Sequence, residues 1–338
     1  LAALLALRFI APMLFAEHSS AGFGAHEFFG PREYARSQPG VLLHYLRLVF
    51  WPHPLVFDYG WPVAQAVREI VPQTLAVLAL LGATAALIVR RHPLGAAAGA
   101  FVLYLAPTTS FVPLKDLAFE HRLYLPLAAV LVAALAVLAR GFPAARRAPL
   151  LVGTGVLLAL PLCALTVLRN REYASAESIW TTVVARAPGN PRGYNNLAAL
   201  RIDQERHAEA EQLLARALEL KPRYAKAEDN LGVLAAARGR IELALQHFAR
   251  ANEIEESARV HGHMARLLEL TGRAAEAEQH HRRALELAPR DGRVHLAHGQ
   301  FLARTGRVEE ARAALARALE LDPLGSEARR ELERLPPP

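Results

Sequence analysis

The sequence predicts an all-α protein in two parts, a polytopic transmembrane helix bundle followed by a helical solenoid. Long apolar runs almost free of charge fill the first half, whereas a unit of about 34 residues recurs in the second half. Residues 1–169 hold 13 Lys and Arg against 7 Asp and Glu, and residues 170–338 hold 26 against 25. The basic balance therefore comes mainly from the first half. Without a basic cluster that has interleaved aromatics, we expect no nucleic-acid partner.

The apolar runs predict membrane spans, because a helix needs about 20 mostly apolar residues to cross the hydrocarbon core of a bilayer. The chain opens inside one such run, so we expect the N-terminal part of the first span to be missing. The alternative, buried helices of a soluble protein, is disfavoured because these runs have almost no charged face. The predicted spans are residues 1–15, 71–89, 94–111, 123–139 and 150–168.

The positive charges in the short loops predict the orientation of these spans. Arg90 and Arg91 follow the second predicted span, and three further arginines follow the fourth, so both loops belong inside. The loop of residues 16–70 and the whole solenoid then lie outside the cytoplasm. Within that loop, residues 41–51 are apolar but too short to span, which favours an interfacial helix. We expect a bacterial inner-membrane protein with membrane lipid around its spans.

The second half repeats a pattern similar to that of the tetratricopeptide repeat (TPR), a pair of antiparallel helices. Residues 191–325 divide into four units, with a half-repeat linker helix at 170–190 and a capping helix and tail at 326–338. The fold class is therefore a transmembrane bundle followed by a TPR α-solenoid. The position of the family's Leu-Gly pair is held by Leu197–Ala198, Leu231–Gly232, Met264–Ala265 and His298–Gly299.

The second residue of each repeat is basic, and the residue four positions later lies on the same helix face. The TPR resemblance implies that these positions line a groove for a protein or an extended peptide. An Asn amide donates and accepts at once, which suits a peptide unit. The alternative is an ordinary solvated helix edge. The groove candidates are Arg192, Asn196, Lys226, Asn230, Arg259, His263 and Arg293.

Charged residues also gather at the predicted outer face between the third and fourth spans. Charge at membrane depth is costly and is a functional hypothesis by default. The alternative is a structural collar of ion pairs, Lys115–Asp116 and Glu120–Arg122. The chain has one cysteine, Cys163, which excludes an internal disulfide.

Residues 45–62, 120–126 and 169–173 resemble segments of the bacterial relatives of the transmembrane, TPR-containing protein O-mannosyltransferases, which are GT-C-like glycosyltransferases. That resemblance implies transfer of a sugar from a polyprenyl-phosphate donor to protein at the outer face. It places the catalytic acid upstream of this sequence, so no catalytic residue is assigned. It also implies a donor-phosphate site formed from Lys115, Glu120, His121, Arg122 and Arg8.

No other cofactor is evident. His261 and His263 lie two positions apart on a predicted helix and point in different directions, so we expect no metal site. The alternative function is a non-catalytic, membrane-anchored TPR scaffold for protein–protein interaction in the cell envelope.

Overall fold

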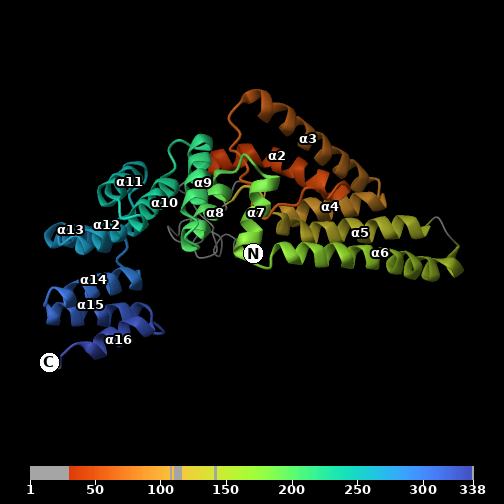
Figure 1. Cartoon of the computed structure of the whole chain (residues 1–338). Helices are drawn as coiled ribbons and strands as arrows, with labels where there is room; N and C mark the ends of the chain where they lie inside the picture. Colours follow the sequence, from red (N-terminus) through yellow and green to blue (C-terminus); the bar gives the residue numbers. More distant parts are fainter. Residues whose placement is uncertain (1–29, 107–108, 110–115, 141–142, 337–338) are drawn as a thin grey trace, which may run out of the picture. The chain divides into compact units, whose positions relative to one another are not determined.

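The computed structural model describes residues 30–106, 109, 116–140 and 143–336, and their regular structure is helical throughout (Figure 1). The chain divides into two compact units, Leu1–Gly193 and Tyr194–Pro338. The predicted span 1–15, with Arg8, lies outside the described residues, and so does Lys115. The first unit extends past the expected linker of residues 170–190.

Helix α2, Pro31–Phe50, forms the core of the first unit. Tyr34, Val41, Tyr45 and Leu48 recur at helical spacing and are all buried, so one face of the helix is covered along most of its length. The predicted interfacial helix at 41–51 was therefore too short at its start, because the helix continues through Pro39. Burial on both sides of this proline offsets the one backbone hydrogen bond that it removes.

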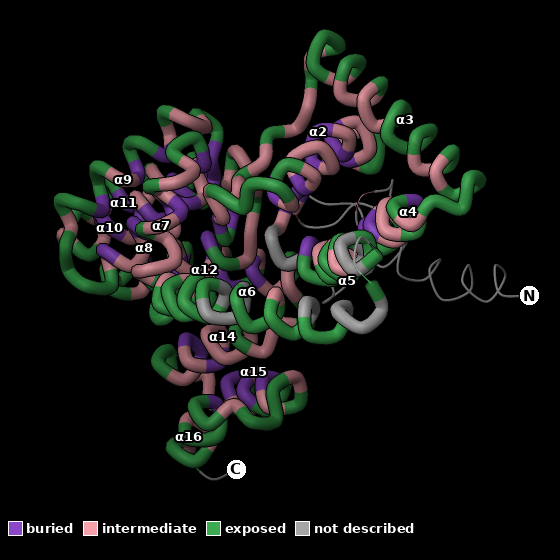
Figure 2. The backbone as a smooth tube through the Cα atoms, turned by 90° about the vertical axis from the view of Figure 1, so that its right-hand side faces the viewer, coloured by how far each residue is buried: buried purple, intermediate pink, exposed green. Residues whose placement is uncertain are grey.

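The apolar runs of the first unit form the helices α3 Val67–Val89, α4 Pro93–Leu105, α5 Tyr124–Arg140 and α6 Ala144–Glu172. Among the described residues, only α3 is both long and apolar enough to cross a membrane. Helix α4 has 13 residues, which at about 1.5 Å per residue is too short for the span predicted at 94–111. It ends at Leu105, and Pro107, two residues further on, has no N–H to donate to a continuing helix. Figure 2 shows α3 without a buried residue.

The connection between α2 and α3 is tied to the end of the first unit. Arg186 of α7, Ala176–Arg186, donates to the carbonyl oxygen of Leu55 at 2.9 Å. Phe57 packs edge-on against the rings of Tyr173 and Trp180. These contacts make the predicted linker helix part of the first unit.

The second unit stacks pairs of antiparallel helices, which is the TPR-like solenoid that the sequence predicts (Figure 1). The first three residues of α8 belong to the first unit. The helices are α8 Pro191–Asp203, α9 His207–Leu220, α10 Ala225–Ala237, α11 Ile241–Ile254, α12 Ala258–Leu270, α13 Ala274–Leu287, α14 Gly292–Arg304, α15 Val308–Leu321 and α16 Ser326–Arg334.

Small residues let the two helices of each repeat approach closely. A Cβ atom on Gly232 would lie 2.5 Å from the ring of Phe248, and one on Gly299 would lie 2.7 Å from Leu315. Ala198 holds the corresponding position of the first repeat and is fully buried. This contact explains why the second residue of the Leu-Gly pair is always Gly or Ala.

The first residue of that pair is less regular, because the fourth repeat carries His298 where a leucine packs in the first two repeats. The ring stacks on Phe301, and its Nε2 atom is buried without a hydrogen-bond partner among the described residues. Burial is the main cause that lowers the pKa of His298 to about 4, and His281 and Arg307 add to the effect. His298 therefore stays neutral and unsatisfied at neutral pH.

We predict that His298→Leu stabilises the solenoid by about 1 kcal/mol at pH 7, because it removes an unsatisfied buried polar atom. The unfolded chain binds a proton on this histidine between about pH 6.5 and 4 and the folded chain does not. Stability is therefore lost as pH falls through that window in the parent only, and the advantage of the variant should grow. Thermal unfolding at pH 7 and pH 5 measures both effects, and an advantage that shrinks at pH 5 would contradict the assignment.

Candidate functional site

Polar pairs connect the first helices of neighbouring repeats. Asn230 of the second repeat donates from Nδ2 to Oδ1 of Asn195 in the first repeat at 2.9 Å. His263 of the third repeat lies with Nδ1 2.8 Å from Oδ1 of Asp229 in the second repeat. We call these two pairs the inter-repeat ladder, and in each of them the fifth residue of one repeat contacts the sixth residue of the next repeat.

The ladder leaves hydrogen-bonding groups open at its first step. Asn195 is almost fully buried and donates from Nδ2 to Oδ1 of Asn196 at 3.1 Å. The chain of three amides leaves Nδ2 of Asn196 and Oδ1 of Asn230 without a partner among the described residues. One donor and one acceptor are the two groups that a peptide unit requires.

In the second pair of the ladder, the carboxylate of Asp229 has charged or ionisable partners on two sides. The side chain of Asp229 is 1% exposed and is held by His263 and by the guanidinium of Arg259. Three predicted groove positions, Asn230, Arg259 and His263, therefore also join neighbouring repeats.

The predictions missed Asn195 and Asp229. A signal for both existed, because they occupy the same position of successive repeats, and Asn and Asp are poor residues for a helix interior unless their side chains have partners.

The other basic candidates lie in different surroundings. Arg192 binds the carboxylates of Asp58 and Asp116 in the first unit, at 2.5 Å for one contact with each. Burial opposes its charge, but the two carboxylates outweigh burial and raise the pKa of the guanidinium. Lys226 is exposed.

Arg293 is 88% exposed and folds back on Asp291, two residues earlier. That hydrogen bond is the main cause that lowers the pKa of Asp291.

The predicted donor-phosphate residues lie around the short helix η1, Glu120–Leu123. The guanidinium of Arg122 donates to the carbonyl oxygens of Asp116 at 2.8 Å and Leu117 at 3.1 Å. It also lies 3.5 Å from the hydroxyl of Tyr34. The side chains of Glu120 and His121 lie outside the described residues. The predicted ion pair between Glu120 and Arg122 therefore lies outside them too.

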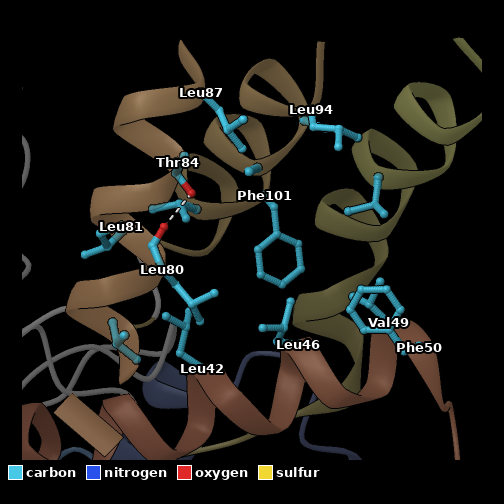
Figure 3. A pocket seen from close by; sticks show the side chains of 15 residues that line it. Leu42, Leu46, Val49, Phe50, Leu80, Leu81, Thr84, Leu87, Leu94 and Phe101 are labelled. Atoms are coloured by element: carbon cyan, nitrogen blue, oxygen red, sulfur yellow. Dashed lines mark hydrogen bonds between the residues drawn. The ribbon is translucent and has the colours of Figure 1, made fainter. Parts of the chain in front are cut away.

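An apolar cavity of about 250 Å³ lies among α2, α3, α4 and α5 (Figure 3). Phe101 points into the space between Leu46 of α2 and Leu80 of α3. Thr84 carries the one polar side chain of the lining, and its hydroxyl donates to the carbonyl oxygen of Leu80. The cavity therefore suits an alkyl or isoprenoid chain better than a polar ligand.

Within the described parts of the chain, no three His, Cys, Asp or Glu side chains gather as metal ligands would. His261 and His280 contact each other through their Nδ1 atoms at 2.8 Å, so one ring donates to the other.

Comparison with known proteins agrees with the repeat pattern. The family model of the tetratricopeptide repeat matches residues 167–231 and 268–335. None of the curated proteins matches the chain.

Similar solved structures include TTC0263, a TPR protein of Thermus thermophilus, with 22% identity and a TM-score of 0.44 over 54% of this chain and 96% of that one. YrrB, described as a TPR protein with an unusual peptide-binding site, has 22% identity and a TM-score of 0.36 over 47% of this chain and 87% of its own. MamA has 18% identity and a TM-score of 0.37 over 46% and 91%.

The chain is thus an all-α protein that carries TPR repeats, and TPR domains bind peptides or proteins.

Proposed function

We propose that this protein is a membrane-anchored TPR scaffold whose repeats bind an extended segment of a partner protein. The observation that carries the proposal is the open pair formed by Nδ2 of Asn196 and Oδ1 of Asn230. The amides of Asn195 and Asn230 are buried, and hydrogen bonds join all three amides, so the two open groups are held in place before a ligand arrives. Such preorganisation reduces the entropic cost of binding.

The membrane part of the proposal rests on exposed apolar helices. The most apolar 18-residue window of α3 has none of its residues buried. Exposed apolar side chains continue on α5 and α6, and contiguous apolar surface of this kind indicates a membrane or a protein partner. We favour a lipid environment at a bacterial inner membrane, with the repeats outside the cytoplasm. The exposed side chains include Leu75, Leu78, Leu125, Val132, Val156, Leu157 and Leu165.

We predict that Asn196→Asp weakens the binding of an uncharged extended peptide about tenfold, which corresponds to about 1.4 kcal/mol. The substitution keeps the oxygen that accepts from Asn195 and replaces only the outward donor by an acceptor. A fluorescent peptide selected from a random library on the parent protein measures the affinity, at 0.5 M salt to screen the added charge.

The thermal midpoint is the control for this prediction, and it should stay within a few degrees of the parent value. Asn230→Ala serves as a contrast, because it leaves Oδ1 of Asn195 unsatisfied and should lower stability by about 1 kcal/mol. Unchanged peptide affinity in Asn196→Asp would remove this pair from the binding surface.

For the orientation, we expect a reporter that works only outside the cytoplasm to be active when fused after Leu335. The reason is that the predicted inner loops carry Arg90, Arg91 and Arg140. A reporter that works only in the cytoplasm, fused at the same place, is the control. Activity of the second reporter alone would reverse the proposed topology.

A second candidate is the GT-C-like transferase, in which a polyprenyl-phosphate-linked sugar is the donor. The apolar cavity among α2, α3, α4 and α5 favours it, because an isoprenoid chain needs an apolar site of this kind. Arg122 lies on the same unit and uses part of its guanidinium on backbone carbonyls, so that it is held firmly beside Tyr34.

If Arg122 holds the donor phosphate, Arg122→Lys should reduce sugar transfer at least tenfold, because lysine keeps the charge but loses the planar fork. Transfer from a polyprenyl-phosphate sugar to peptide by the membrane-inserted protein is the measurement, with membrane insertion as the control. Arg140→Lys is the matched substitution at an exposed arginine. Equal transfer by the parent and by Arg122→Lys would mean that Arg122 holds the loop through Asp116 and Leu117 and does not bind the donor phosphate.

A further inference from the structure

The inter-repeat ladder is interrupted between the third and fourth repeats. The residues that would form its next pair are Gly262 and Ala297, which stand 33 or 34 positions after Asp229 and His263. Neither has a polar side chain, and both are smaller than the residues that they replace. The space that a polar pair fills in the two preceding steps is therefore left open.

A cavity of about 220 Å³ lies at this place, among α12, α13 and α14. Its walls are mostly small and apolar, with Ala258, Gly262, Ala284, Val294 and Ala297. His281 also lines the cavity; its side chain is 3% exposed, and its Nε2 is held 2.7 Å from Glu269. The cavity thus has a fixed polar group beside its apolar walls.

Packing within the solenoid does not require the glycine. A Cβ atom on Gly262 would meet no other atom within 4 Å, whereas one on Gly232 or Gly299 would collide with the second helix of its repeat. Glycine is also a poor residue for a helix interior. Neither packing nor helix propensity therefore explains the glycine at position 262.

The rim of the cavity carries two arginines and one carboxylate, that of Asp291. Arg259 and Arg293 both line it, and their side chains are 55% and 88% exposed. Arg259 has a buried acid from the preceding repeat as its partner, but the corresponding acid for Arg293 would stand at Gly262 and is absent. Arg293 pairs instead with Asp291 through Nε and Nη2, which leaves Nη1 without a partner among the described residues.

We propose that this cavity is an anchor pocket for one apolar side chain, up to aromatic size, in a partner segment with acidic residues on both sides of that anchor. The proposal rests on the proposed binding function and names the chemistry of its partner. The apolar walls accept the anchor, and a dry cavity of about 150 Å³ is already large enough for benzene. The two arginines on the rim select carboxylates beside it.

The probe is a fluorescein-labelled nine-residue peptide with a central Phe and two Glu on each side, tested on the purified full chain. Two related peptides replace Phe by Ala or all four Glu by Gln. The parent should bind the first peptide at least tenfold more tightly than the Ala peptide and, at 50 mM salt, several-fold more tightly than the Gln peptide.

Two variants fill the cavity in different ways. Gly262→Leu fills it with an apolar side chain. The double variant Gly262→Asp and Ala297→His fills it with a polar pair that copies Asp229 and His263 of the preceding step. Both should lose the preference for Phe over Ala and should melt no lower than the parent, because the Cβ position is open. Ala316→Leu, on the exposed side of α15, is the matched control and should keep the preference.

The charge component is tested by Arg293→Gln, which keeps Arg259 and should reduce the preference for Glu over Gln at low salt by at least half. Arg317→Gln, at another exposed ion pair, is its control. Persistence of the Phe preference in both filled variants would overturn the proposal, and so would equal binding of the Phe and Ala peptides by the parent. A parent that binds neutral library peptides but none of the three probes would overturn the anchor pocket alone. A parent that binds no peptide would overturn the proposed function as well.

Discussion

The solenoid depends on the close approach of the two helices in each repeat. Gly232 and Gly299 lie against Phe248 and Leu315 at distances that leave no room for a side chain. This approach fixes the register of every pair and therefore the positions of the first helices in successive repeats. Residues 33 or 34 apart then recur in equivalent surroundings, which is why Asn230 reaches Asn195 and His263 reaches Asp229.

Much of the fold could be predicted from sequence because the same constraint leaves a repeated pattern. Four units with a small residue after Leu, Met or His are visible in the chain itself. The helices of the first unit were harder to delimit. Whether α2 stops at Pro39 depends on how much of the helix is buried on each side of it, and sequence periodicity gives no measure of that burial.

The candidate site was predicted in part. The residue types at the groove positions follow from the repeat register, but their partners depend on how neighbouring repeats stack. Arg192 and Arg259 hold the same repeat position, yet Arg259 binds Asp229, one repeat away, and Arg192 binds Asp58, far away in the sequence. The first repeat has no complete repeat before it, so carboxylates from the first unit take the place of the missing ladder acid.

The same comparison explains why Arg293 differs from the other two arginines. Arg192 and Arg259 each pair with an acid from the preceding element that is almost fully buried. For Arg293 that acid is replaced by Gly262, whose presence in a helix interior costs about 1 kcal/mol relative to alanine. At the step between the third and fourth repeats, helix propensity is therefore lower and the polar contact of the preceding steps is absent. Stability lost at a single position, with an open cavity and an exposed arginine as its structural result, is the pattern expected where a site serves binding rather than folding.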